Sequence, residues 1–306
     1  MNRAHLTRRD FALSAFAAAA FPALARPQTQ DVMFRISLAQ WSLHRTLFAG
    51  DLDPLDFAPA ARDRYAIDAV ELVNTFIVDK ARDTTYLDHM KRRADDAGVS
   101  ILLIMCDGIG AIGDPDPVKR GQAVDGHVRW LEAAARLGCH AIRVNAQSNG
   151  TWDEQQQRAA DGLHRLATLA VGYELDVIVE NHGGLSSNGA WLAGVIRRVD
   201  LDNCGTLPDF GNFCTDWSRS SDPDAWYDRY KGVEELMPYA KAVSAKSHAF
   251  DAEGNETRTD YLRMMRIVTA AGYRGYVGIE YEGERVSEHE GILRTKALLE
   301  RVRDQL

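Results

Sequence analysis

The sequence predicts an α/β protein with a single (β/α)8, or TIM, barrel, and three observations support this prediction. Short runs rich in β-branched residues recur eight times, and a stretch of helical character follows each run. No Pro- or Ser-rich linker divides these units. The 306 residues are enough for such a barrel, which needs roughly 250 residues. We therefore expect one barrel domain over residues 33–306.

The eight expected strands start roughly 30 to 40 residues apart, which suits a strand, a helix and their loops. They cover residues 35–40, 68–73, 100–105, 141–145, 176–181, 205–209, 242–248 and 276–281. An open, doubly wound sheet is the alternative, but no Gly-x-Gly-x-x-Gly motif follows the first run. The barrel is therefore the favoured fold.

Residues that begin and end helices lie between these runs. Asp53-Pro54 and Asp222-Pro223 each pair an N-cap with a proline at the first helical position. Gly98, Gly138 and Gly272 stand just before the next strand, where a helix is expected to stop. These signals agree with the strand–helix alternation.

The first 25 residues have the pattern of an export signal. Thr7-Arg8-Arg9-Asp10-Phe11 precedes an Ala-rich stretch that ends in Ala23-Leu24-Ala25, a pattern cut by signal peptidase. The arginine pair resembles the twin-arginine signal, although an N-terminal amphipathic helix is the alternative. We therefore expect residues 1–25 to be a twin-arginine signal peptide and the mature protein to be periplasmic.

The composition, 45% hydrophobic and 26% charged residues, is that of an ordinary globular protein. A formal net charge of −8 disfavours binding to the phosphate backbone of nucleic acid. No apolar run approaches the roughly 20 residues that a membrane-spanning helix needs. We therefore expect a small-molecule substrate, with no nucleic acid and no membrane as partner. The oligomeric state stays open, and a homo-oligomer is one option.

Metal-capable side chains stand at the ends of four consecutive strands. They are Glu180, Asp209, His248 and Glu280. Active sites of such barrels lie at the carboxyl ends of the strands, so these side chains are expected to share one rim. Three carboxylates and one imidazole suit Mn²⁺, Mg²⁺ or Co²⁺, with Zn²⁺ as a further option. The alternative is that each residue makes a rim salt bridge.

Other polar side chains are expected on the same rim. Because side chains alternate along a strand, His182 is expected to point inward with Glu180, and Lys246 with His248. Trp41 and His44 follow the first strand, where they form either a sugar-stacking wall or ordinary rim packing. Asn145 ends the fourth strand and is placed to reach a substrate hydroxyl group.

Four motifs resemble those of the xylose-isomerase-like TIM-barrel family of sugar isomerases and epimerases. The resemblance covers residues 33–306, and the leader resembles a twin-arginine signal. The motifs are Ser37-Leu-Ala-Gln-Trp-Ser-Leu-His44, Val179-Glu-Asn-His-Gly-Gly184, Leu207-Pro-Asp-Phe-Gly-Asn-Phe213 and Gly278-Ile-Glu-Tyr-Glu-Gly283.

The resemblance implies that Glu180, Asp209, His248 and Glu280 bind one divalent metal ion, and that the two glutamates form an acid/base pair. Ketose 3-epimerases usually carry a histidine three residues after the aspartate, where this chain has Asn212. Some members of the family act instead as lyases, hydratases or deglycosidases on 3-keto-glycosides.

The function that these residues predict is a divalent-metal-dependent sugar isomerase or epimerase. The metal polarises a ketone, one glutamate removes the adjacent proton, and the resulting enediolate is reprotonated. Lys246 is expected to stabilise the oxyanion, His182 to shuttle a proton, and Asn212 to contact the substrate. A lyase, hydratase or deglycosidase on 3-keto-sugars shares the first step and is the nearest alternative. A non-catalytic periplasmic sugar-binding protein is an alternative of another class.

Overall fold

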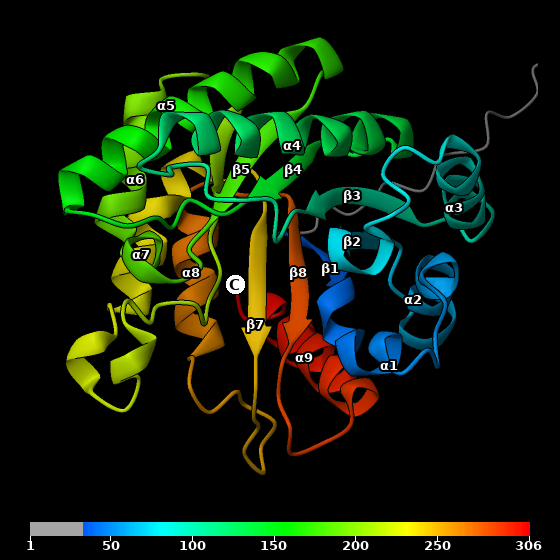
Figure 1. The fold of residues 1–306 in the computed structure, drawn as a ribbon. Coiled ribbons are helices and arrows are strands. Elements are labelled where there is room, and N and C mark those ends of the chain that lie inside the picture. Colours follow the sequence, from blue (N-terminus) through cyan, green and yellow to red (C-terminus); the bar gives the residue numbers. More distant parts are fainter. Residues whose placement is uncertain (1–32) are drawn as a thin grey trace, which may run out of the picture. The chain divides into compact units, whose positions relative to one another are not determined.

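The computed structural model describes residues 33–306, so the signal peptide expected at residues 1–25 lies outside the described residues. Within 33–306, eight parallel strands alternate with helices (Figure 1). The strands are β1 (Arg35–Ala39), β2 (Ala69–Val73), β3 (Ser100–Met105), β4 (Ala141–Val144), β5 (Asp176–Glu180), β6 (Cys204–Leu207), β7 (Val243–Ser247) and β8 (Tyr276–Tyr281). Each one lies within two residues of its expected bounds.

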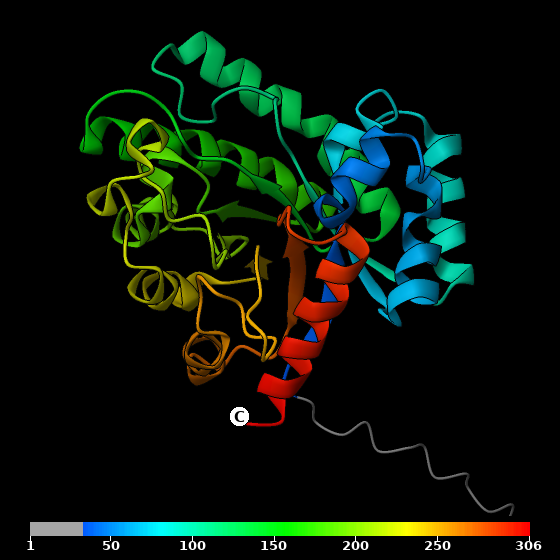
Figure 2. The same ribbon diagram turned by 90° about the horizontal axis from the view of Figure 1, so that it is seen from below.

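The α-helices lie on the outside of the strands (Figure 1). They are α1 (His44–Phe48), α2 (Phe57–Tyr65), α3 (Thr84–Asp96), α4 (Pro117–Leu137), α5 (Trp152–Ala170), α6 (Gly189–Val199), α7 (Arg229–Leu236), α8 (Tyr261–Ala270) and α9 (Glu288–Arg303). Helix α9 packs against β8, so the last helix covers the strand next to β1 (Figure 2).

The strands follow the order β6-β5-β4-β3-β2-β1-β8-β7, which curls the sheet round until β6 approaches β7. Two isolated parallel bridges, Thr206 with Ala240 and Asp209 with Ser244, connect these two edges. The second bridge brings Asp209, two residues beyond β6, beside Ser244 near the start of β7. The structure confirms the predicted (β/α)8 barrel.

The expected capping residues are found at the ends of helical segments. Asp53 accepts a hydrogen bond from the Leu55 amide and caps a 3-10 turn that leads into α2. Gly138 ends α4 with φ of 78°, a left-handed conformation that glycine adopts without steric cost.

The barrel interior is packed with apolar side chains below the polar mouth. Buried residues from several strands form this layer: Ala39, Val73, Leu103, Met105, Ile178 and Leu207. Their burial contributes roughly 25 cal/mol for each Å² of apolar surface removed from water. Among the described helices, none has the length and apolar character needed to cross a bilayer.

Candidate active site

The mouth of the barrel contains two adjoining cavities. One, of about 620 Å³, is lined by Trp217 and Trp226, and we call it the tryptophan lobe. The other, of about 370 Å³, is lined by Arg143 and Asn145, and we call it the arginine lobe. Both volumes fall in the range of small-molecule pockets. The side chains that line both lobes are His182, Lys246 and Glu282.

Three buried carboxylates meet at the carboxyl ends of the strands. Glu180 ends β5, Asp209 lies two residues beyond β6, and Glu280 lies in β8. One oxygen from each residue lies within 4.8 Å of the others, and we call this group the carboxylate triad. The structure thus brings together three of the four metal ligands that the sequence predicts.

Asp209 is held by the turn that follows it. Its Oδ1 accepts hydrogen bonds from the amides of Gly211 (2.8 Å) and Asn212 (2.7 Å). Its Oδ2 accepts one from the Ser244 hydroxyl at 2.7 Å. Burial raises the pKa of Asp209, while the charge of Lys246 opposes the rise.

Ser244, which the sequence analysis did not single out, links two members of the triad. Its Oγ lies 2.7 Å from Asp209 Oδ2 and 2.9 Å from Glu280 Oε2. A hydroxyl has one proton, so it donates to one carboxyl at a time. The signal was available in the sequence, because Ser244 precedes Lys246 by two residues and shares its face of the strand.

Lys246 is a buried cation at the junction of the two lobes. Its Nζ lies 3.5 Å from Glu280 Oε2 and 3.2 Å from Glu282 Oε2. Burial alone would lower the pKa of Lys246, but the surrounding carboxylates raise it well above its usual value. Lys246 is therefore positively charged at neutral pH. Burial raises the pKa of Glu280 well above its usual value, although Lys246 opposes that rise.

Arg143 is a second buried cation that sequence reasoning missed. Its Nε lies 2.9 Å from Glu180 Oε2 in a close ion pair that is not an aligned hydrogen bond. Its Nη1 donates to Asp107 Oδ1 at 2.6 Å, and Asn145 Nδ2 donates to the same oxygen at 2.7 Å. An arginine inside an otherwise apolar strand was the available signal, since a buried charge needs a partner.

Glu180 has both of its oxygens engaged. Asn212 Nδ2 donates to Oε1 at 2.8 Å, and Arg143 approaches Oε2. Asn212 thus lines the tryptophan lobe while contacting the triad. Glu180 itself is 1% exposed and is not among the residues that line either lobe.

Another buried carboxyl is Glu71 in β2, which the sequence analysis did not single out. Its Oε1 accepts a hydrogen bond from Ser37 Oγ at 2.6 Å. Burial raises the pKa of Glu71 to about 7, and the nearby charge of Glu180 adds to this. The barrel therefore holds more carboxyls than the strand-end pattern predicts.

His248 lies outside the carboxylate triad, although the sequence predicts it as a metal ligand. Strand β7 ends at Ser247, so the alternation that directs Ser244 and Lys246 inward does not extend to residue 248. His248 instead lines the tryptophan lobe. Burial and the charge of Arg258 lower the pKa of His248 to about 4.

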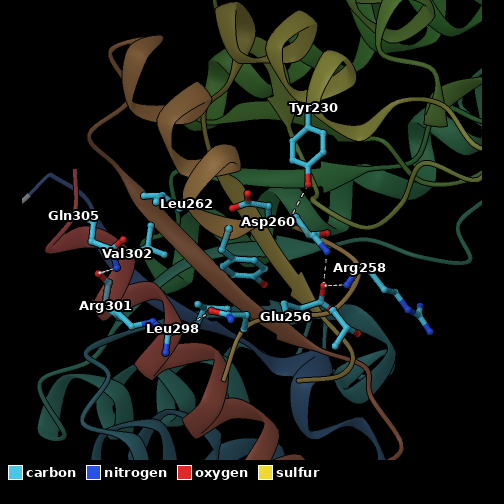
Figure 3. Close-up of a pocket in the computed structure, with 13 residues that line it drawn as sticks. Tyr230, Glu256, Arg258, Asp260, Leu262, Leu298, Arg301, Val302 and Gln305 are labelled. Carbon is cyan, nitrogen blue, oxygen red and sulfur yellow. Dashed lines mark hydrogen bonds between the residues drawn. The ribbon is translucent and has the colours of Figure 1, made fainter. Parts of the chain in front are cut away.

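The loop after β7 is held by Glu256. Its Oε1 accepts hydrogen bonds from the amides of His248 (3.2 Å) and Ala249 (3.4 Å). Its Oε2 accepts two more, from the amides of Arg258 and Thr259, each at 2.6 Å. Figure 3 shows Glu256 and Arg258 on the wall of a neighbouring cavity, which shares Arg258 with the tryptophan lobe and which residues of α9 also line. One carboxylate thus positions both ends of the loop that carries His248 and Arg258.

His182 lines both lobes, as its predicted role requires. Its Nδ1 is buried and has no hydrogen-bond partner in the described part of the chain. The loop that carries it is tight, because Ser187 Oγ accepts a hydrogen bond from the Gly183 amide at 2.9 Å. His182 therefore lines both lobes together with Lys246, while its Nδ1 is buried.

Of the two residues predicted at the end of the first strand, Trp41 lines a lobe and His44 does not. Trp41 lines the arginine lobe, and the His44 ring stacks on it with centroids 4.9 Å apart and planes at 14°. His44 is not among the residues that line either lobe, and its Nδ1 lies 2.7 Å from the Trp41 carbonyl oxygen. His44 therefore supports Trp41 from behind.

The triad can hold a metal ion, because three buried carboxylates lie close enough to coordinate one cation. Its donor set does not fit the four-ligand centre that the sequence predicts. His248 is outside the group, and the Ser244 hydroxyl lies between two of the carboxylates. Both oxygens of Glu180 already contact donor groups. The arrangement lacks the nitrogen ligand, and donors or cations of the chain already contact at least one oxygen of each carboxylate.

Comparison with known families gives one match that spans most of the chain. The profile of the family described as "Xylose isomerase-like TIM barrel" matches residues 60–303. Among curated proteins, the chain is 35% identical to the C-glycoside deglycosidase alpha subunit of Arthrobacter globiformis over 66 residues. That match covers 22% of this chain and 17% of the relative, so it concerns a small part of both proteins.

Several solved structures share the fold. The 3-keto-D-glucoside 4-epimerase of E. coli is 18% identical, with a TM-score of 0.62 over 81% of this chain and 94% of that one. A D-tagatose 3-epimerase-like protein is 15% identical, with a TM-score of 0.65 over 89% and 98%. The zinc-bound IolI protein is 12% identical, with a TM-score of 0.69 over 89% and 99%. At these identities the likeness shows a common fold.

Proposed function

Because the chain belongs to the xylose isomerase-like TIM barrel family, we propose that it is a carbohydrate isomerase or epimerase. The observation that carries this proposal is the pairing of a buried carboxylate, Glu280, with a buried ammonium, Lys246, in the arginine lobe. A base and a cation side by side are what proton abstraction next to a carbonyl requires. The similar structures named for sugar epimerases support a sugar as the substrate.

In this mechanism the sugar lies in the arginine lobe with its carbonyl oxygen toward Lys246. Glu280 removes the proton from the neighbouring carbon, and the electron pair of the C–H bond moves onto the carbonyl oxygen. Lys246 stabilises the negative charge of the resulting enediolate. Return of the proton to the opposite face gives an epimer, and its return to the former carbonyl carbon gives an isomer.

The second proton carrier is His182 in this proposal. Its ring lines both lobes, where the imidazole can accept a proton from a substrate hydroxyl group or return one. Glu180, which the sequence predicts as the partner of Glu280, is held by Asn212 and Arg143. We therefore give Glu180 the role of positioning Arg143. Asn145 and Trp41 also line this lobe, where they contact the sugar.

A lyase or deglycosidase is the second candidate, and the two-lobed mouth favours it. A glycoside with its sugar in the arginine lobe would place the rest of the molecule in the tryptophan lobe, past Lys246 and Glu282. The short similarity to a C-glycoside deglycosidase subunit points in the same direction. If a leaving group stands β to the carbonyl, the same enediolate expels it.

Proton NMR in D₂O tests both candidates. The purified protein is incubated with free ketoses and, separately, with 3-keto-glucosides. Deuterium in a sugar of unchanged composition is the result expected for an isomerase or epimerase, and the labelled carbon identifies the reaction. Release of water or of the aglycone makes the protein a lyase or deglycosidase. Absence of both on either substrate class contradicts the proposal and favours a sugar-binding protein.

A further inference from the structure

Hydrogen-bond donors of the chain contact each carboxylate of the triad, while Glu180 Oε2 has only its ion pair with Arg143. Ser244 bridges Asp209 and Glu280, with its Oγ at 2.7 and 2.9 Å. Asn212 donates to Glu180, and two backbone amides donate to Asp209. A metal ion would compete with these contacts for the lone pairs of the carboxylate oxygens, and the single proton of Ser244 serves one of its two contacts at a time.

Two cations of the chain also occupy the surroundings of the triad. Arg143 pairs with Glu180 at 2.9 Å, and Lys246 lies 3.5 Å from Glu280. Both cations are 3% exposed, so water screens their charges weakly. They supply the positive charge that clustered carboxylates require, and they repel a further cation.

We propose that this protein works without a divalent metal ion, and that Lys246 and Arg143 take over the electrostatic role of the metal. The disagreement between the predicted four-ligand set and the observed donors carries this inference, which rests on the proposed function for its chemical step. In that step the C–H proton goes to Glu280 and the electron pair goes to the carbonyl oxygen beside Lys246. The proton then returns, so the reaction needs no oxidant or further reactant.

Metal content and thermal unfolding of the purified protein test the inference without any substrate. We expect far less than one Mg²⁺, Mn²⁺, Co²⁺ or Zn²⁺ ion per chain by mass spectrometry. We also expect the same Tm with EDTA as with each ion added, because a ligand that binds the native state raises its stability. One ion per chain, removed by EDTA with a fall in Tm and absent from Asp209→Asn, would overturn the inference.

The variant Lys246→Met provides a second test, based on the affinity for Mn²⁺. Removing this ammonium leaves the triad with excess negative charge, so we expect the variant to bind Mn²⁺ at least about tenfold more tightly than the parent. The rise of Tm with Mn²⁺ measures this. Lys241→Met is the matched control, because Lys241 pairs with Asp176 at the start of β5, at the other end of the barrel. A parent protein that binds Mn²⁺ as tightly as Lys246→Met contradicts the inference.

The exchange assay separates this inference from the proposed function. If deuterium exchange occurs, its rate should stay within about twofold after EDTA treatment. A loss of exchange that Mn²⁺ restores overturns the inference while the proposed function stands. If no sugar exchanges deuterium at all, the proposed function fails, and metal content and Tm still decide whether the site is metal-free.

Discussion

Single residues at the mouth of the barrel are arranged for chemistry at the expense of stability. Glu280 is 4% exposed, and burial raises its pKa well above the usual value of 4.5. A carboxyl with a raised folded pKa stabilises the folded state when protonated; this contribution is complete below the unfolded pKa and is lost as the pH rises through the folded pKa. Ionisation of Glu280 in the folded state therefore costs folding free energy, which its proposed function as a base explains.

Glu280→Gln should separate activity from stability. We expect proton exchange to fall by about 10²- to 10⁴-fold, because the amide cannot act as a base. The free energy of unfolding should stay the same or increase at pH 7, because the substitution removes a buried group whose ionisation is unfavourable. Lys246 Nζ also retains its ion pair with Glu282 Oε2 at 3.2 Å. The difference in Tm between variant and parent should shrink as the pH falls toward 4.5.

Glu284→Gln is the control for this prediction, because Glu284 is exposed and close in sequence. It should change neither the exchange rate nor the Tm. A marked loss of stability in Glu280→Gln at neutral pH would show that Glu280 is mainly a structural partner of Lys246.

At the scale of elements, the end of one strand decides which side chains enter the site. Strand β7 carries Ser244 and Lys246 on its inward face and stops at Ser247. The loop that follows is held in place by Glu256, whose carboxylate accepts hydrogen bonds from four backbone amides. His248 therefore belongs to the loop, and its position depends on Glu256 rather than on strand geometry.

Glu256→Ala should loosen this loop. Four amides lose their acceptor, and we expect the free energy of unfolding to fall by about 1–3 kcal/mol. Denaturant unfolding measures the loss. Glu256→Gln should be intermediate, because its amide group keeps one acceptor oxygen. Glu253→Ala, at an exposed position of the same loop, should have no effect. Equal stability of Glu256→Ala and Glu253→Ala would refute the anchoring role.

For the whole molecule, the two lobes set the size of the substrate that fits. They meet at His182, Lys246 and Glu282, so a substrate can place its reacting carbon there and extend into either lobe. The tryptophan lobe is bounded by Trp217, which is 60% exposed and packs edge-to-face on Trp226 with centroids 5.8 Å apart. An exposed aromatic face at the rim is suited to stacking on a ring of the ligand.

Trp217→Ala should therefore affect large and small substrates differently. For a 3-keto-glucoside with an aromatic aglycone we expect KM to rise about 2- to 10-fold, which corresponds to the loss of one aromatic contact. The KM for a free ketose should not change, because such a substrate occupies the arginine lobe alone. Trp152→Ala is the control, since Trp152 is exposed and outside both lobes. An equal rise for both substrates would contradict a two-lobed substrate.

Much of the site follows from the sequence because parallel strands of a barrel end at one rim. A carboxylate at a strand end must then lie near the next one, which is why Glu180, Asp209 and Glu280 meet in space. Arg143 and Ser244 were missed because they lie within strands, where the pattern indicates packing. Their role depends on which side chain of a neighbouring strand they face, and the sequence does not contain that register.

The sequence by itself determined the eight strand–helix units, the barrel and the rim on which the acidic residues lie. These features depend on local periodicity and on the direction of parallel strands, and both can be read along the chain. Only the tertiary structure decided that Ser244 and Arg143 contact the carboxylate triad while His248 lies outside it. The reason is that the closing bridge between Asp209 and Ser244, and the end of β7 at Ser247, depend on how distant segments pack.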